Sequence, residues 1–438
     1  MPRDASPFTP GHPADPALFV GRTGELDAIQ QRMKALIKGR SECFVVTGPR
    51  GIGKSSLARY VVEAARRRGW LREPMLAAHC FVGKAARLED VWRRVAEALV
   101  LALPSDKGLL ETAKKLLKDV VSFNVDIGLF SLRLERRKDA FRVEDISLLE
   151  VLRRFWSLAK RAKLAGLIVA LDDVSEAIKT EGFAVELKRT IDQNASAREK
   201  IPFSIILVGQ EEIRQRLEAD EPSVLRIFHP ISLEPLSYQD CRDFFFKAFN
   251  QVGLECNDEA IQLMSAFSSG YPPILHEIGD AAYWLDKDGT IDIFDAWSAA
   301  KKAADTAGRR YLETSVYNAL ASRRYQTALE VVSVKLPSPF QSFTRQQLLA
   351  WLPQKEKRVA NNFLQRMVRI GVLQHVSRGE YKFANPLFWF YVRGRFLKGL
   401  RQSEKDVRQA LDWASSVIRV LEERLNNSRN EENGVSFM

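Results

Sequence analysis

One octapeptide constrains the fold of this chain more than any other part of its sequence. Residues 48–55 read Gly-Pro-Arg-Gly-Ile-Gly-Lys-Ser and match the pattern G-x-x-x-x-G-K-[ST] in full. The apolar run Cys43–Val46 precedes the octapeptide and the helix-like stretch Ser56–Val62 follows it, so a strand, a glycine turn and a helix are predicted. Glycines let backbone N–H groups turn inward around a polyphosphate, and the positive end of the following helix favours the same anion. The stretch therefore predicts a nucleoside triphosphate site.

Two side chains of this turn carry chemistry of their own. The Lys54 ammonium can reach the β- and γ-phosphates, and the Ser55 hydroxyl can complete a Mg²⁺ shell. The alternative is a glycine-rich turn that binds nothing, and the flanking strand and helix argue against it. The expected contacts with the nucleotide in this stretch are Gly48, Pro49, Arg50, Gly51, Ile52, Gly53, Lys54, Ser55 and Ser56.

Length and composition narrow the class of protein. A chain of 438 residues suggests about three domains. No apolar stretch is long enough to span a membrane, and the N-terminus has no basic-then-apolar segment, so we expect a cytoplasmic protein. The cysteines have no metal-ligand spacing, and we expect free thiols in a reducing compartment. They are Cys43, Cys80, Cys241 and Cys256.

The positive charge of the chain lies in its last third. Residues 301–438 carry 24 lysines and arginines against 12 aspartates and glutamates, whereas residues 1–300 carry 42 against 43. This asymmetry is typical of a module that faces a nucleic acid. A basic surface that only keeps the protein soluble is the alternative.

A pair of carboxylates follows a second apolar strand. The run Leu167–Leu171 is typical of a strand buried on both faces of a parallel sheet, and such strands present ligands at their carboxyl ends. Asp172 is predicted to hold the metal, and Asp173 to orient or deprotonate the attacking water. The alternative is that the pair caps a helix. Glu176, one turn later, is a weaker candidate for the base.

Three further residues are candidates for transition-state contacts. Gln210 ends the strand Phe203–Val208 and can contact the γ-phosphate or the water, or else cap the next helix. An arginine finger that reaches a neighbouring subunit would add a large rate factor. Arg226 is the first choice for it and Arg198 the second.

The chain divides into five predicted parts. A disordered, proline-rich leader covers 1–17, and the nucleotide-binding core covers 18–235 with a helix-hairpin insertion at 104–145. A helical lid without strands covers 236–305, a winged helix domain 306–400, and a helix and tail 401–438. His276, on a lid helix, is predicted to be a packed core residue.

The last third has the element order of a winged helix-turn-helix. Helices are predicted at 311–335, 344–352 and 357–370, followed by strands at 372–376 and 381–383. Such a domain binds DNA through phosphate contacts or clamps the nucleotide site from within. The basic residues expected to face DNA are Lys355, Lys357, Arg358, Arg366, Arg369, Arg378 and Lys382.

Several of these motifs occur in the order seen in one family. Phe19–Arg22, residues 48–55, Leu171–Asp173, Leu207–Gln210 and Gly270–Pro272 follow one another as in AAA+ ATPases. Over roughly residues 19–400 the chain most resembles the branch that joins origin-recognition/Cdc6-type proteins, ExeA/TnsC-type ATPases and STAND signalling ATPases. The resemblance implies ATP rather than GTP. The residues that it implies around the adenine are Val20, Gly21, Arg22, Tyr271 and Pro272.

Two departures from the family pattern favour a slow switch over a fast motor. Asp173 stands where many AAA+ enzymes have glutamate, which resembles the STAND type. Pro273 stands where related ATPases often place a sensor arginine.

The sequence therefore predicts an α/β P-loop ATPase with a parallel sheet flanked by helices, a helical lid and a C-terminal winged helix. Its cofactors would be ATP and Mg²⁺, ATP would set the orientation of core and lid, and the chain would form homo-oligomers. In one hypothesis it is a DNA-associated ATPase. In another it is a signalling or anti-phage defence switch whose winged helix is autoinhibitory and whose partner is a protein. A third hypothesis is a nucleotide-binding scaffold that does not hydrolyse.

Overall fold

A computed structural model describes most of the chain. The described residues are 5–12, 15–84, 87–116, 124–125, 132–133, 147–268, 270–311, 322–337, 341–384, 388–389 and 391–393. They divide into two compact units. The sheet unit comprises Arg22–Pro49 and Gly53–Glu234, and the helical unit comprises Met1–Gly21, Arg50–Ile52 and Pro235–Met438.

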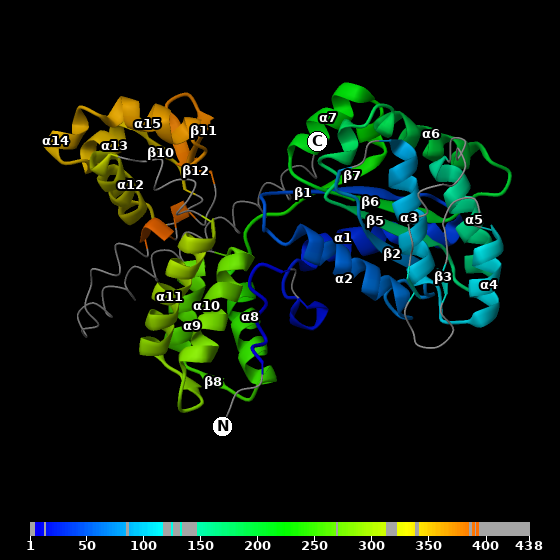
Figure 1. Cartoon of the computed structure of the whole chain (residues 1–438), viewed down its shortest axis with the longest axis horizontal. Helices are drawn as coiled ribbons and strands as arrows, with labels where there is room; N and C mark the ends of the chain where they lie inside the picture. Colours follow the sequence, from blue (N-terminus) through cyan, green and yellow to red (C-terminus); the bar gives the residue numbers. More distant parts are fainter. Residues whose placement is uncertain are drawn as a thin grey trace, which may run out of the picture. The chain divides into compact units, whose positions relative to one another are not determined.

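A five-stranded sheet forms the centre of the sheet unit, in the order β2-β5-β6-β1-β7 (Figure 1). Every neighbouring pair is parallel, which confirms the predicted sheet. Three of the strands are apolar runs buried at every position, as strands covered on both faces must be. The strands are β1 Cys43–Thr47, β2 Leu76–Phe81, β5 Leu167–Asp172, β6 Phe203–Val208 and β7 Phe228–Ser232.

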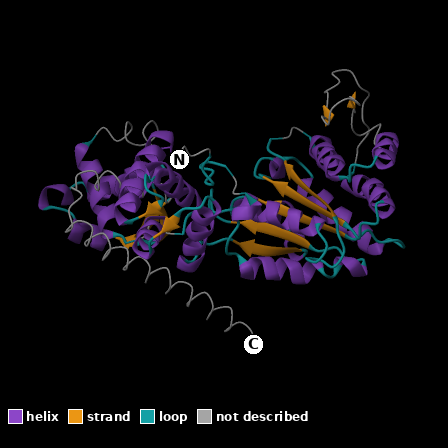
Figure 2. Cartoon of the chain, turned by 90° about the horizontal axis from the view of Figure 1, so that it is seen from below, coloured by secondary structure: helices purple, strands orange, loops and turns teal. Residues whose placement is uncertain are grey.

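Helices cover both faces of this sheet (Figure 2). Helix α2 packs on β2, β5 and β6. On the other face, α3 contacts β2 and β5, and α5 contacts β5. One helix, α6, was not predicted from the sequence. The bounds are α1 Thr23–Met33, α2 Lys54–Arg66, α3 Leu88–Ala102, α4 Lys107–Leu116, α5 Leu148–Arg161, α6 Phe183–Ser196 and α7 Glu212–Asp220.

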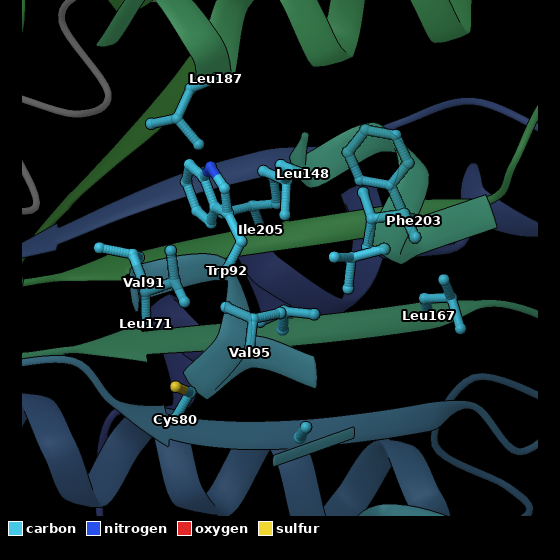
Figure 3. Packing of buried hydrophobic residues seen from close by; sticks show 14 of the residues in the cluster. Cys80, Val91, Trp92, Val95, Leu148, Leu167, Leu171, Leu187, Phe203 and Ile205 are labelled. Carbon is cyan, nitrogen blue, oxygen red and sulfur yellow. The ribbon is translucent and has the colours of Figure 1, made fainter. Parts of the chain in front are cut away.

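The main core lies between the sheet and helices α3, α5 and α6. Trp92 of α3 stacks on Phe183 of α6 with ring centroids 5.8 Å apart, and both are almost fully buried. Figure 3 shows Trp92 beside Leu187, above side chains of β5 and β6. Alternation along the strands sends Cys80 and Leu171 toward this core. Their neighbours in sequence must therefore point to the opposite face, where α2 lies.

The predicted insertion agrees with the structure where it is described. Strands β3 Asn124–Val125 and β4 Leu132–Arg133 pair antiparallel, as a hairpin requires. Helix α4 lies in the same stretch, at Lys107–Leu116. Residues 117–123, 126–131 and 134–145 of the expected insertion lie outside the described residues.

The helical unit contains four long helices that pack on one another (Figure 1). They are α8 Tyr238–Gln251, α9 Asp258–Ser268, α10 Pro272–Leu285 and α11 Ile293–Tyr311. One expectation for this region was wrong. Two short parallel strands pair here, β8 Glu255–Cys256 and β9 Thr290–Ile291, although no strand was expected. Helix α11 continues through residue 305, where the boundary between lid and winged helix domain was expected.

The described part of the remaining helical unit includes helices α12 to α15 and a three-stranded antiparallel sheet in the order β10-β12-β11. The helix expected at 311–335 corresponds to a helix that begins at Arg323, and residues 312–321 of the expected helix lie outside the described residues. Residues 401–438 lie outside the described residues. The bounds are α12 Arg323–Lys335, β10 Phe343–Thr344, α13 Arg345–Trp351, α14 Gln354–Lys357, α15 Ala360–Arg369, β11 Leu373–Ser377 and β12 Glu380–Phe383. Among the described helices, none has the length and apolar character needed to cross a membrane.

The leader differs from the expected disorder at Phe8, which is only 3% exposed. Its ring lies 5.7 Å from that of Phe244 and 5.2 Å from that of Phe249, both on α8. The Thr9 N–H donates to Nδ1 of His276 on α10 at 3.1 Å. Burial lowers the pKa of His276 to about 4, so its Nδ1 remains an acceptor at neutral pH, and the predicted core role of His276 agrees with this packing.

Gly279 of α10 makes the space for the Phe8 ring. A Cβ at this position would lie 2.2 Å from the ring, too close for any contact. We expect Gly279→Ala to lower the melting temperature of the wild-type chain, because the ring or the helix must move. In a Phe8→Ala background the clash is gone, and the same change should be neutral or stabilise by about 1 kcal/mol through helix propensity.

Thermal unfolding of the four chains of this double-mutant cycle provides the measurement. Phe8→Ala alone should cost about 3 kcal/mol, as for other buried aromatic rings. His12→Ala, an exposed residue of the same segment, is the control and should change nothing. Equal effects of Gly279→Ala in both backgrounds would show that Phe8 does not occupy this space.

Candidate functional site

The glycine turn connects β1 to α2 at the carboxyl edge of the sheet. Three of its glycines have positive φ: 144° at Gly48, 86° at Gly51 and 103° at Gly53. Residues with a side chain rarely adopt these angles, so the local sequence specifies the turn. Helix α2 starts at Lys54, directly after Gly53, so the positive end of the helix, which favours an anion, lies at the end of the turn.

Lys54 lies over this turn. Its Nζ donates to the carbonyl oxygen of Gly48 at 2.9 Å and to that of Pro49 at 2.8 Å. The ammonium is therefore held at the start of the turn by groups that a phosphate can replace. This is the position in which the sequence predicted a phosphate-binding cation.

Asp172 ends β5 next to the start of α2. Its Oδ1 accepts from the Ser55 hydroxyl at 3.1 Å and from the Asp173 backbone N–H at 3.0 Å, and its Oδ2 lies 3.0 Å from Nε2 of His79. Burial raises the pKa of the Asp172 carboxyl, but hydrogen bonds from His79 and Ser55 outweigh burial and leave the pKa below its ordinary value. Asp172 is thus a buried carboxylate that stays ionised.

Asp172 and Asp173 do not cap a helix, which removes the alternative role for the pair. The next helical turn spans Ala177–Lys179 and has Glu176 as its N-cap, without a side-chain capping bond. Asp173 is exposed and has φ 56°, which is uncommon for a residue with a side chain. Glu176 is paired with Lys179, and the hydrogen bond from Lys179 lowers the pKa of Glu176.

The structure separates the other candidates. Gln210 is exposed just after β6 at the same edge of the sheet, and the N-cap of α7 is Glu211, so Gln210 does not cap that helix. Arg226 precedes β7, whose first residue pairs with the first residue of β1. Arg226 therefore lies at the amino edge, opposite the glycine turn, and is exposed. Arg198 is exposed in the bend that follows α6.

Two segments implied by the resemblance lie in the helical unit or at its boundary. A Cβ on Gly21 would lie 2.6 Å from the carboxyl carbon of Asp240, so only glycine fits beside the capping box that begins α8. Arg22, which follows it, is buried and bonds to Glu25 at 3.3 Å, and Val20 is half-buried.

The tip of the glycine turn, Arg50–Ile52, groups with the helical unit. Within that unit the Tyr271 hydroxyl donates to the carbonyl oxygen of Arg50. A Cβ on Gly51 would lie 2.8 Å from the Tyr271 hydroxyl and 2.8 Å from Pro273 Cγ. Pro272 follows Tyr271 as the first residue of α10. Within the helical unit, Tyr271 therefore contacts Arg50 and lies beside Gly51.

The donor set fits a triphosphate with a hard cation. The turn supplies backbone N–H groups and an ammonium, and Ser55 with Asp172 supplies the oxygen ligands that Mg²⁺ prefers. Two protein oxygens are typical of magnesium bound together with a nucleotide, because Mg²⁺ retains waters and phosphate oxygens as its other ligands. Among the described residues, no cluster of three or more His, Cys, Asp or Glu could hold a metal by itself.

Sequence reasoning missed His79, which lies on β2 and contacts Asp172. The cysteines, by contrast, agree with prediction as free thiols, and three are fully buried. Burial raises the pKa of Cys43 and of Cys80 to about 12, so neither can act as a nucleophile at neutral pH.

The basic residues of the last third lie on α14, α15 and the β11–β12 hairpin, or directly after α14. Lys355, Arg358, Arg369 and Arg378 are exposed, and Lys357, Arg366 and Lys382 are half-buried. The exposed residues of α15 also include the amides Asn361, Asn362 and Gln365.

Comparison with known proteins agrees with this geometry. Residues 18–195 match the family model described as "AAA ATPase domain". A search of curated protein sequences finds no match. The walker-type ATPase PABY2304 of Pyrococcus abyssi superposes with a TM-score of 0.51 at 18% identity, covering 86% of this chain and 96% of that chain.

Two Aeropyrum pernix structures are also similar. The ORC2 protein in its ADPNP-ADP complexes has a TM-score of 0.49 at 12% identity and covers 91% of this chain and 94% of its own. The ORC1 protein in complex with DNA has a TM-score of 0.41 at 14% identity, with 92% and 94% covered. The domain match, together with the fold shared with the Pyrococcus abyssi protein, supports a P-loop ATPase of the AAA type.

Proposed function

We propose that this protein binds ATP with Mg²⁺, hydrolyses it slowly and acts as a nucleotide-dependent switch that associates with DNA. The observation that carries the proposal is the contact between the Ser55 hydroxyl and Asp172 Oδ1, beside a glycine turn that holds Lys54. Backbone amides, an ammonium and two hard oxygen ligands converge there. A triphosphate with its metal is the ligand that uses all of them.

Each residue has a role in this proposal. The turn and Lys54 bind the phosphates, and Ser55 and Asp172 hold the magnesium. When bound, the metal neutralises charge on the phosphates. Asp173, exposed beside Asp172, orients or deprotonates the water that attacks. Gln210 lies at the same edge and can contact that water. These roles require only positioning and electrostatics, which account for most of phosphoryl-transfer catalysis.

The adenine contacts and the finger are part of the same proposal. The residues that would surround the adenine are Val20, Gly21, Arg22, Tyr271 and Pro272. The contact between Tyr271 and Arg50 supports the proposed role of Tyr271. Arg226 lies at the opposite edge of its own sheet. We therefore propose that it acts on the nucleotide of a second copy, in a homo-oligomer.

The hydrogen bond from the Tyr271 hydroxyl to the carbonyl oxygen of Arg50, both within the helical unit, supports the switch. The helical unit also carries the basic residues on α14 and α15, and its order of helices followed by a hairpin supports our proposal of a winged helix there. Phosphate release from ATP by the purified chain, with Mg²⁺, tests the enzymatic half of the proposal. A chain that binds ATP and releases no phosphate would be a scaffold instead.

The DNA half predicts a salt-dependent affinity. In filter binding, retention of double-stranded DNA should fall steeply as salt rises, because each phosphate contact releases a counterion. Arg358→Gln with Arg369→Gln should lower the slope of log affinity against log salt by about 2. Both residues are exposed, so the double variant should retain the wild-type melting temperature.

The control removes two exposed arginines from the sheet unit, Arg67→Gln with Arg68→Gln. It has the same change in net charge and should leave the slope unchanged. If wild-type protein retains no DNA at low salt, the DNA half of the proposal is wrong. A protein partner for the last third, as in a signalling or defence switch, would then be the better hypothesis.

A further inference from the structure

His79 contacts the proposed magnesium ligand Asp172, and the proposed function does not use it. Strands β2 and β5 are parallel neighbours, with His79 paired to Ala170 and Phe81 to Asp172. Because side chains alternate along a strand, His79 and Asp172 both point to the face on which α2 packs. The ring Nε2 reaches Asp172 Oδ2 at 3.0 Å, and the ring is 18% exposed.

The two carboxylate oxygens of Asp172 have different hydrogen-bond partners. Oδ2 lies against His79, while Oδ1 accepts from the Ser55 hydroxyl and from the Asp173 N–H. A carboxylate bound on one side only can rotate, but one with partners on both oxygens has a fixed plane. In this arrangement Oδ1 is held toward Ser55, the other proposed magnesium ligand.

We propose that His79 is a positioning residue that sets the orientation of Asp172 for magnesium. It acts through Asp172 and does not touch the nucleotide. Hydrogen-bond partners of metal-binding carboxylates commonly change metal affinity by 10–100-fold when they are removed. The inference rests on the proposed function, since it concerns the same magnesium site.

Two amide substitutions test the geometry. In His79→Gln the side-chain nitrogen can occupy the position of Nε2 and donate to Oδ2. In His79→Asn the chain is shorter, so the nitrogen corresponds to Nδ1 and does not reach. Both amides are uncharged and polar, so a difference between the two variants reports the position of the donor.

The measurement is calorimetric titration of ATP into the full chain, over a series of Mg²⁺ concentrations and in EDTA. Mg²⁺ should raise the ATP affinity of each protein. We expect the Mg²⁺ concentration that gives half of this rise to be about 10-fold or more higher in His79→Asn than in wild type. His79→Gln should stay within about threefold of wild type. The affinity for ATP in EDTA should be the same in all three proteins, because His79 does not contact the nucleotide.

His229→Leu is the matched control. His229 on β7 also pairs with a carboxylate, Glu42, at 3.0 Å, but Glu42 precedes β1 at the opposite edge of the sheet. The Mg²⁺ requirement of His229→Leu should equal that of wild type. Equal Mg²⁺ requirements of the Gln and Asn variants, whether high or low, would overturn the inference. If wild type does not bind ATP at all, the proposed function itself fails, and that result is distinct.

Discussion

Replacing Lys54 by alanine is expected to remove most of the thermal stabilisation that ATP and Mg²⁺ give to the chain. The ammonium of Lys54 is held at the turn by the carbonyls of Gly48 and Pro49, where a phosphate would receive it. At a ligand concentration of 100 Kd the wild type gains about 2.7 kcal/mol. If Kd rises about 100-fold in the variant, the gain at the same concentration falls to about 0.4 kcal/mol.

The measurement is the melting temperature with and without ATP and Mg²⁺. The wild type should rise by several degrees, at roughly 2–4 °C per kcal/mol for a domain of this size. Arg59→Ala is the control, because Arg59 is exposed on the same helix and should leave the shift intact. Equal shifts in Lys54→Ala and wild type would show that the turn is not the triphosphate site.

The parts of the fold that sequence predicted well are those with strong local patterns. The strands β1, β5 and β6 are continuous apolar runs, and the turn after β1 has a pattern that few sequences match by chance. Parallel strands end at a common edge, so the meeting of Ser55 and Asp172 also follows from the sequence.

Residues that act through register or long-range packing were missed. His79 is a lone histidine in a strand, and only the pairing of β2 with β5 brings it to Asp172. Phe8 lies in a proline-rich segment, whose composition predicts disorder. Its burial depends on the space beside Gly279 of α10, which a Cβ would fill. Neither the contact of His79 with Asp172 nor that of Phe8 with Gly279 can be found without the three-dimensional structure.

Short elements were missed for a different reason. The strands β8, β9 and β10 have two residues each, too few to show any alternation. Helix α11 continues through residue 305, where a domain boundary was expected, and the sequence pattern alone does not show where that helix ends.

The second large effect is expected at Asp173, and its backbone decides which substitution is informative. Its φ of 56° is tolerated by asparagine, whereas alanine there would add strain. Asp173→Asn should therefore remove the carboxylate and keep the turn. We expect phosphate release to fall about 100-fold or more, the usual contribution of a general base. The Kd for ATP with Mg²⁺ should change less than about threefold, because Asp172 and Ser55 remain.

Single-turnover phosphate release and a binding titration, made on the same preparation, separate chemistry from affinity. Glu176→Gln is the control, because the Glu176 carboxylate is already paired with Lys179 and should leave the rate unchanged. If Glu176→Gln released phosphate slowly and Asp173→Asn released it at the wild-type rate, Glu176 would be the base instead of Asp173. Equal rates in all three proteins would mean that neither carboxylate activates water. The hydrolysis would then depend on the turn and the metal alone, as in a slow switch whose state is set by binding rather than by turnover.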